Sequence, residues 1–193
     1  MVRLHSKMYQ LFKEQKSVHV LYPYVGVKNY ISTVVDFVLN GIMAGDYVIL
    51  IENERNYRLI HRELSNRLTF EQFNFFHRVN NFDFYFTNGS YHPPAILEYF
   101  NKTVQPYLDK NLSFRTWAHV EWASVEDPLH LIEDIERTAD EKVISLSFPL
   151  ICAYEAEQMP IQLQTILFET HQYILLEENF ISSELYIPLV DVE

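Results

Sequence analysis

Glycine is scarce in this sequence: only 4 of its 193 residues are glycine, and 8 are proline. No Gly/Ser-rich tract, low-complexity run or internal repeat interrupts the chain. A second domain would need a linker of such composition, so we expect one well-cored domain. We place this domain at residues 17–193 and interpret residues 1–16 as a helical N-terminal extension.

Cysteine is nearly absent as well, because Cys152 is the only one. A single cysteine excludes an internal disulfide framework and is typical of a reducing compartment. Its apolar strand offers no obvious cationic neighbour, so we expect a buried, inert thiol. No run approaches the roughly 18 apolar residues of a membrane span, and the basic N-terminus lacks the apolar core of a secretory signal. We therefore expect a cytoplasmic protein.

Positive charge is in short supply: 15 lysine and arginine residues stand against 26 aspartate and glutamate residues, a formal net charge of −11. Such a surface repels the phosphates of nucleic acids and of anionic lipids. The balance therefore disfavours direct binding to nucleic acid or membrane. Aromatic residues are frequent, at 15%, and predict an aromatic-rich core together with a cavity or interface of the same kind.

Residues 17–52 are the segment around which the predicted fold is built. They fit the order strand, loop, amphipathic helix, turn and strand, which opens a parallel α/β sheet. A phosphate-binding loop after such a strand needs several glycines and then Lys-Ser or Lys-Thr. The loop at residues 22–29 has only Gly26, and its Pro23 has no N–H to donate. The sequence therefore excludes a phosphate loop here.

Short apolar or aromatic runs recur along the chain, with helical patterns between them. We predict strands at residues 19–21, 46–51, 82–86, 113–122, 143–154 and 173–176. Residues 69–81 fit a loop or a strand fragment, Gly41 and Gly45 are expected to end the first crossover helix, and Pro149 implies an edge strand, a bulge or a strand end. A helix in each gap predicts parallel pairing through right-handed crossovers. The expected fold is a three-layer α/β sandwich with a mostly parallel central sheet.

Ligands bind such sheets beyond the carboxyl ends of the strands. The predicted strand ends carry polar and aromatic side chains, namely Tyr22, Tyr24, Glu52, Thr87, Asn88, residues 119–122, Tyr154, Glu155, Glu177 and Glu178. Aromatic side chains at this edge suit a flat or apolar ligand better than a phosphate. They are equally common in protein cores, so both interpretations stay open.

His119 and Glu121 lie two residues apart on a predicted strand, so their side chains share one face. They fit a hydrogen-bonded polar pair, part of a ligand pocket, or a general base with its orienting carboxylate. A zinc site has no evident third ligand, and the sequence has no G-x-S-x-G nucleophile elbow. We therefore predict no metal site, no cofactor and no enzymatic activity.

Several blocks of residues occur in the order and spacing of a known family: His19-Val-Leu-Tyr22, Asn40-Gly41-x-x-x-Gly45-Asp46, Trp117-x-x-x-Glu121, Leu150-Ile-Cys-x-Tyr154-Glu155, Thr170-His171 and Glu178-Asn179. With these blocks, residues 17–187 resemble the MEDS domain (methanogen/methylotroph, DcmR sensory domain). The resemblance implies a RecA-like fold with a degenerate nucleotide site that lacks the phosphate loop. It also implies a sensory domain that binds a small organic compound.

Members of that family are usually fused to a DNA-binding or histidine-kinase module, and neither pattern is visible in this sequence. We expect a stand-alone sensory domain that signals through a partner, such as a histidine kinase or transcription regulator, or through self-association. Transcriptional, two-component or sporulation-type control would fit. The alternative is a ligand-free interaction module that inhibits or scaffolds a signalling protein. The residues predicted to contact a ligand are His19, Tyr22, Tyr24, Glu52, Trp117, His119, Glu121, Trp122, Tyr154 and Glu155.

Overall fold

The computed structural model describes residues 2–87, 89, 91–121, 129–176 and 179–188. Within these residues, seven strands form one sheet in the order β3-β2-β4-β5-β1-β6-β7. The strands are β1 (Val18–Tyr24), β2 (Tyr47–Glu52), β3 (Phe76–Asn80), β4 (Phe114–His119), β5 (Pro149–Glu155), β6 (Tyr173–Leu176) and β7 (Asn179–Ser182). Every pair from β3 to β6 is parallel, and β7 pairs antiparallel with β6. The prediction of a mostly parallel sheet is confirmed.

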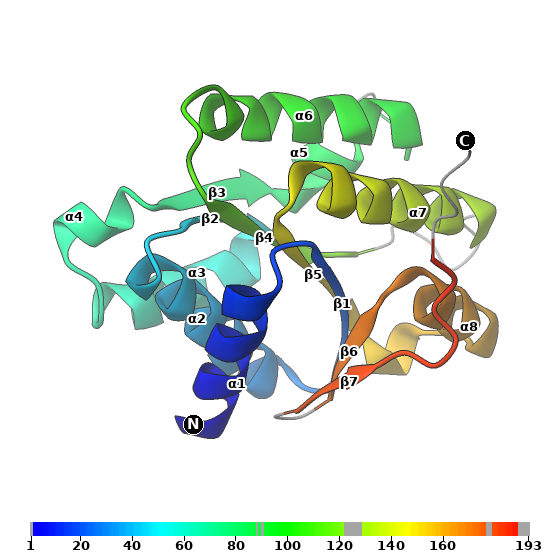
Figure 1. The fold of residues 1–193 in the computed structure, drawn as a ribbon, viewed down its shortest axis with the longest axis horizontal. Coiled ribbons are helices and arrows are strands. Elements are labelled where there is room, and N and C mark those ends of the chain that lie inside the picture. The colour runs from blue at the N-terminus through cyan, green and yellow to red at the C-terminus, as the bar shows by residue number, and fades with distance from the viewer. Residues whose placement is uncertain (1, 88, 90, 122–128, 177–178, 189–193) are drawn as a thin grey trace.

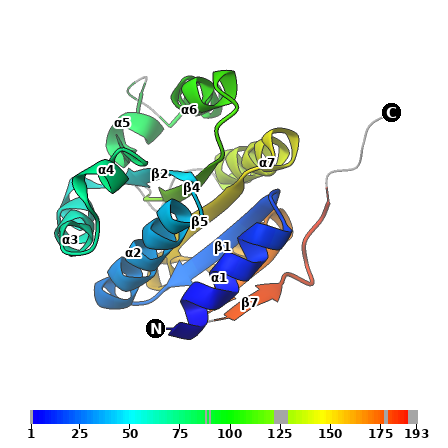
Figure 2. The same ribbon diagram turned by 60° about the vertical axis from the view of Figure 1, so that its left-hand side comes forward.

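Helices cover both faces of the sheet, so the domain has three layers (Figures 1 and 2). One face carries α1 (Val2–Glu14), α2 (Val27–Met43) and α3 (Glu54–Ser65). The other carries α5 (Asn81–Tyr85), α6 (Pro93–Asp109), α7 (Leu129–Leu146) and α8 (Ile161–Thr170). The short elements α4 (Phe70–Phe73) and η1 (Ala156–Gln158) complete the described set. Each face has its own hydrophobic core, which confirms the three-layer sandwich.

The central strands are buried on both faces because successive side chains enter opposite cores. In β1, Val20 packs into the core beneath α1 and α2, whereas Leu21 packs into the core on the other face. In β4, Trp117 and Ala118 divide between the two cores in the same way. The near-continuous apolar runs in the sequence follow from this double burial.

Gly41 lies inside α2, not at its end as the sequence predicted. A Cβ atom at this position would lie 2.5 Å from Val48 Cγ2 and 2.9 Å from Arg115 Cδ. Only glycine therefore lets the helix approach β2 and β4 this closely. The helix ends at Met43, and Gly45 follows it with a φ of 83°, as expected of the glycine after a helix.

A buried ion pair joins α2, β2 and β4. The Arg115 guanidinium donates to Asp46 Oδ2 from Nε at 2.9 Å and to Asn40 Oδ1 at 2.9 Å, and Ser113 Oγ donates to Asp46 Oδ1 at 2.5 Å. Arg115 is 2% exposed. Burial lowers the pKa of Arg115, although the Asp46 carboxylate opposes that shift. The arginine therefore serves the fold, because its charge is matched inside the core.

The predicted strand at residues 82–86 is wrong, because this segment is helix α5. The third strand is the preceding β3, in the segment that was expected to be a loop or strand fragment. The Asn80 side chain ends the strand and starts the helix, since its Oδ1 accepts hydrogen bonds from the backbone N–H of Phe82 at 2.9 Å and of Asp83 at 3.3 Å. Phe84 is buried and Phe82 is 67% exposed. The aromatic run is therefore a one-sided helix and not an alternating strand.

The predicted strand at residues 143–154 begins too early. Helix α7 continues to Leu146, Ser147 takes a φ of 54°, and β5 starts at Pro149. Pro149 is thus at a strand end, one of the three positions expected for it, in a strand that is central in the sheet. No helix of the described residues is both long enough and apolar enough to cross a membrane.

Candidate functional site

Four adjacent parallel strands, β2, β4, β5 and β1, bring their carboxyl ends to one edge of the sheet. Their last residues are Glu52, His119, Glu155 and Tyr24. A cleft of about 580 Å³ opens at this edge. Its other walls come from the start of α7 and from the segment that joins β5 to α8. The fold therefore places the cleft where ligands bind in open α/β sheets.

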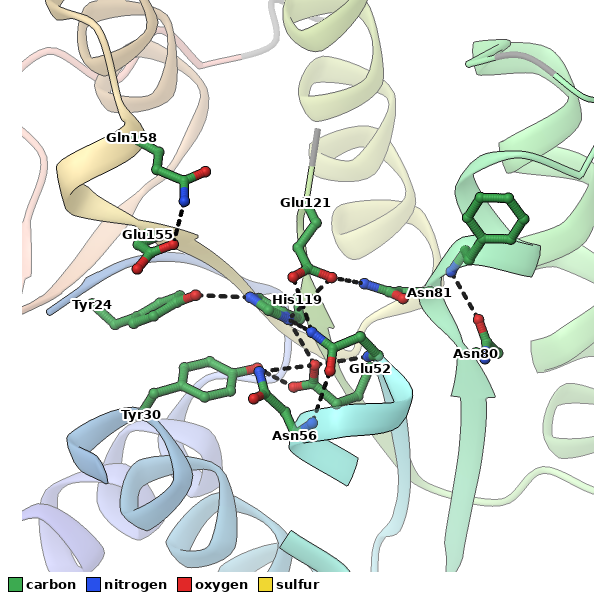
Figure 3. A network of polar contacts seen from close by, with 12 residues as sticks. Tyr24, Tyr30, Glu52, Asn56, Asn80, Asn81, His119, Glu121, Glu155 and Gln158 are labelled. Carbon is green, nitrogen blue, oxygen red and sulfur yellow. Dashed lines mark hydrogen bonds and ion pairs between the residues drawn. The ribbon is translucent and has the colours of Figure 1, made fainter. Parts of the chain in front are cut away.

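His119 forms the floor of the cleft and is held from both sides (Figure 3). Its Nδ1 lies 2.6 Å from Glu52 Oε1, and its Nε2 lies 2.9 Å from the Tyr24 hydroxyl. Glu52 is fully buried and also accepts hydrogen bonds from the Tyr30 hydroxyl and, at 2.8 Å, from the Asn53 backbone N–H. Because a carboxylate only accepts, Nδ1 of His119 carries a proton. Both nitrogens of the imidazole are thus engaged within the protein.

Electrostatics at this floor favour a charged imidazole and neutral phenols. Burial lowers the pKa of His119, but the hydrogen bond and the charge of Glu52 outweigh this effect, so the pKa is raised. Burial raises the pKa of Tyr24, and the charges of Glu155, Glu121 and Glu52 add to the shift. Burial and Glu52 likewise raise the pKa of Tyr30. Both tyrosines therefore remain hydroxyl donors or acceptors at neutral pH.

Glu121 projects over the cleft and is fixed by two asparagines (Figure 3). Asn53 Nδ2 donates to its Oε1 at 2.9 Å, and Asn81 Nδ2 donates to its Oε2 at 2.6 Å. Asn53 is also the N-cap of α3, where its side chain accepts from the Asn56 N–H at 2.8 Å. Glu121 Oε2 lies 3.9 Å from His119 Nδ1, so the nearer carboxylate partner of His119 is Glu52. Glu121 therefore links the cleft to the starts of α3 and α5.

The cleft joins an acidic rim to an apolar wall. Glu121, Glu155 and Glu157 line it, and none of its described lining residues is lysine or arginine. Gln158 Nε2 donates to Glu155 Oε2 at 2.6 Å. The apolar lining residues are Val120, Leu129, Ile132, Met159, Pro160 and Leu163. This surface favours a ligand with an apolar body and a positive or hydrogen-bond-donating end, and it disfavours a phosphate.

The family model described as MEDS, methanogen/methylotroph, DcmR sensory domain, matches residues 18–172. The chain belongs to the MEDS family. Membership confirms the resemblance seen in the sequence and indicates a sensory or regulatory role. Comparison with curated proteins gave no match.

The MEDS domain distributes the predicted ligand-contacting residues over three environments. Along the cleft lie Tyr24, His119, Glu121, Tyr154 and Glu155, with Glu52 directly beneath His119. Tyr22 and Trp117 are in the hydrophobic core, and His19 lies in a separate buried cluster against α7. Trp122 lies outside the described residues.

The polar network of this MEDS domain also includes three residues that the sequence did not single out as ligand-contacting. Tyr30 receives a hydrogen bond from Trp117 Nε1 at 3.1 Å and donates to Glu52, so it orients the buried carboxylate. Asn53 and Asn81 hold Glu121. Asn53 carried a signal, since it lies two residues beyond the predicted second strand and fits a helix cap. Asn81 was hidden by the wrong strand prediction for the residues that follow it.

Proposed function

We propose that this domain is a non-catalytic sensor that binds a small organic molecule in the cleft and reports binding to a partner protein. The partner would be a signalling protein such as a histidine kinase or a transcription regulator. The observation that carries the proposal is the cleft itself: about 580 Å³, apolar on one wall, acidic at the rim, at the carboxyl edge of a sensory-family fold. The volume suits a small organic ligand.

Charge selects the class of ligand. A carboxylate or phosphate ligand would face Glu121, Glu155 and Glu157 without a lysine or arginine among the described lining residues. An amine would instead pair with these carboxylates, while its hydrocarbon part would pack on Leu129, Ile132 or Leu163. We therefore propose an organic amine, or a neutral molecule that donates hydrogen bonds.

The engagement of His119 supports binding over catalysis. A general base needs a nitrogen within reach of the substrate proton. Here Glu52 and the Tyr24 hydroxyl occupy the two ring nitrogens, and the side chain is 2% exposed. The imidazole thus suits a fixed floor that holds Tyr24 and Glu52 in place.

The hydrogen bonds of Glu121 suggest how binding is transmitted. A cation that draws the Glu121 carboxylate into the cleft would weaken its bonds to Asn53 and Asn81. These asparagines sit at the starts of α3 and α5, on opposite faces of the sheet. A small movement of one side chain would then shift the starts of α3 and α5, and a partner protein that binds there would detect the shift.

The second candidate is a protein-interaction module without a ligand. Exposed large apolar side chains favour it: Phe70 is 83% exposed, and Ile161, next to the cleft, is 68% exposed. Side chains of this size at the surface are typical anchors in protein interfaces. The two candidates differ in whether the cleft itself must be intact for regulation.

The test is a thermal-shift comparison of small organic amines with carboxylic acids of the same carbon skeletons. We expect amines to raise Tm and the matched acids to leave it unchanged. Glu121→Gln should weaken the amine effect, whereas Glu98→Gln, a change on the exposed side of α6, should not. An equal response to acids and amines, or an undiminished response in Glu121→Gln, would contradict the proposal. Native mass spectrometry of the gently purified protein would give the mass of any molecule already bound.

A further inference from the structure

A second cluster of polar side chains lies in the interior, apart from the floor of the cleft. It consists of His19 on β1, Cys152 on β5, Glu136 on α7 and His171 directly after α8. All four are buried, with exposed fractions between 0% and 4%. Imidazole, thiolate and carboxylate are the ligand types that zinc takes in proteins. Cys152 is buried, as expected, but its surroundings are polar, because the imidazoles of His19 and His171 and the carboxylate of Glu136 lie beside it.

The spacing of the four ligand atoms matches a tetrahedral ion. Glu136 Oε2 lies 3.4 Å from His19 Nε2 and 3.4 Å from His171 Nε2, and Cys152 Sγ lies 3.5 Å from His19 Nε2. All four atoms lie within 4.8 Å of one another. A zinc ion with bonds of about 2.0–2.3 Å holds its ligands roughly 3.3–3.6 Å apart. Three of the contacts already have this length.

The partners of the two imidazoles direct their lone pairs toward the centre. His171 Nδ1 lies 2.8 Å from the Leu167 carbonyl oxygen, and His19 Nδ1 lies 3.3 Å from Asp140 Oδ1. Carbonyl and carboxylate oxygens only accept, so both Nδ1 atoms carry protons and each Nε2 atom is the one that can offer a lone pair to a metal ion. Burial lowers the pKa of His19, but Asp140 and Glu136 outweigh it and raise the pKa to about 9, so metal binding displaces a proton from its Nε2. A metal-binding histidine typically donates its second N–H to such a carbonyl or carboxylate. Glu136 is oriented in the same way, because the Tyr154 hydroxyl donates to its Oε1.

Two of the converging atoms have no hydrogen-bond partner. Among the described residues, Glu136 Oε2 and His171 Nε2 are buried and unsatisfied, although they lie 3.4 Å apart. The carboxylate oxygen of Glu136 and the Nε2 atom of His171 are thus two acceptors that face each other without a described donor between them. Such a set of acceptors is unfavourable in a buried site unless a cation occupies its centre.

We propose that His19, Glu136, Cys152 and His171 bind one Zn²⁺ ion in a tetrahedral structural site. Binding releases two protons to solvent, one from the thiol of Cys152 and one from Nε2 of His19, while Glu136 and His171 coordinate through lone pairs that they already present. Sulfur and imidazole ligands favour zinc over magnesium or calcium, which take oxygen ligands. Four protein ligands leave no open position, so the site is structural. Glu136 and Cys152 also line a cavity of about 70 Å³ beside the site.

The ion would connect segments that are far apart in the sequence. It would join β1 and β5 in the sheet to α7 and to the end of α8. Tyr154 connects it to the cleft, because its hydroxyl bonds Glu136 and its side chain lines the cleft wall. The site is independent of the proposed ligand: the zinc site can exist whether or not the cleft binds an amine.

The test measures metal content in protein purified without an affinity tag and without chelator. We expect about one zinc per chain in the wild type, the same in the control His61→Gln on the exposed side of α3, and a loss of at least tenfold in Cys152→Ser and His171→Gln. Zinc far below one per chain in folded wild-type protein would overturn the proposal. Unchanged zinc content in both ligand variants would overturn it as well.

A second measurement does not depend on how the variants fold. Wild-type protein stripped of metal is titrated with Co²⁺ alone, and its absorption is recorded. We expect saturation at one equivalent, with the intense visible bands of tetrahedral cobalt and the near-ultraviolet charge-transfer band of a thiolate ligand. Absence of both features would overturn the proposal. Tetrahedral bands without the thiolate band would exclude Cys152 and thus overturn the assigned ligand set.

Discussion

The molecule contains two buried histidine clusters that consist of similar residues but differ in the hydrogen-bond partners of their ring nitrogens. At the floor of the cleft, His119 has Glu52 on one nitrogen and Tyr24 on the other. In the interior, His171 has described partners at Nδ1 only, whereas His19 contacts Asp140 through Nδ1 and Cys152 Sγ through Nε2. Their Nε2 atoms face Glu136 and Cys152. The first cluster is satisfied by the protein, whereas in the second Glu136 Oε2 and His171 Nε2 have no hydrogen-bond partner among the described residues.

The comparison shows that residue type alone does not distinguish the two clusters. Both clusters combine imidazole with carboxylate at hydrogen-bond distances. They differ in how donors and acceptors are arranged: donors alternate with acceptors around His119, whereas two acceptors, Glu136 Oε2 and His171 Nε2, face each other in the interior cluster. The chemistry follows from this pattern, since alternating groups stabilise one another and converging acceptors need a cation.

The largest difference between the clusters is expected on metal removal. A strong zinc chelator should lower the free energy of unfolding of the wild type by several kcal/mol, since a ligand at about a thousand times its Kd contributes about 4 kcal/mol. His119→Gln should lose the same increment, because its site does not involve the ion. His171→Gln should lose almost none. Urea unfolding with and without chelator measures all three. An equal chelator effect in all three proteins would remove the distinction between the clusters.

The next effect tests whether the His119 cluster is complete without an ion. Glu52→Gln keeps an acceptor for His119 Nδ1 but places an N–H group against the Tyr30 hydroxyl, which already accepts from Trp117. The O–H of Tyr30 then has no acceptor for its hydrogen. We expect a loss of about 1–3 kcal/mol in unfolding free energy. Urea unfolding provides the measurement, with exposed Glu98→Gln as a control that should cost about 0.5 kcal/mol or less, since it weakens only a surface ion pair with Lys102. An unchanged unfolding free energy in Glu52→Gln would mean that this carboxylate is not needed for the network.

The sequence predicted the architecture better than the details. Strand and helix signals alternate along the chain, and this order alone implies a parallel sheet with helices on both faces. The run at residues 82–86 was misassigned because short aromatic segments fit a strand or a one-sided helix equally well. The deciding group was the Asn80 side chain, which caps the helix α5.

The two clusters also differ in how far they could be predicted. Residues 52, 119 and 155 end neighbouring strands, so the topology rule alone brings them to one edge. The interior cluster has no such rule, because its members are separated by long stretches of chain and share no local spacing. Its assembly depends on β5 lying beside β1 and on how α7 crosses them. The sequence also showed no third ligand near His119 and Glu121, and it did not group His19 with Glu136, Cys152 and His171.

A pH titration of stability tests whether His119 is charged, and the expected change in unfolding free energy is smaller than in the two experiments above. The pKa of His119 in the folded protein lies above its ordinary value of 6.5. The folded state therefore favours the imidazolium, and its contribution to stability is full below about pH 6.5 and is lost as the pH rises through the raised pKa. The difference in unfolding free energy between wild type and His119→Gln should fall over this range. The interior cluster is present in both proteins, so its own pH dependence cancels in this difference. A difference that is flat, or that grows with pH, would refute a charged His119.

The smallest expected effect concerns the link from cleft to helix. Asn81→Ala removes one of the two side-chain hydrogen bonds that hold Glu121, whose carboxylate is 49% exposed. Because water can replace the lost donor, unfolding free energy should fall by about 1 kcal/mol or less. Amine binding should nevertheless tighten, since Glu121 no longer has to give up that bond to reach a cation. Calorimetric titration with the best amine from the thermal-shift panel measures this gain, with Asn101→Ala on α6 as the matched control. Weaker binding in Asn81→Ala would mean that the asparagine preorganises Glu121 for its ligand, and that the acidic rim works as a rigid site.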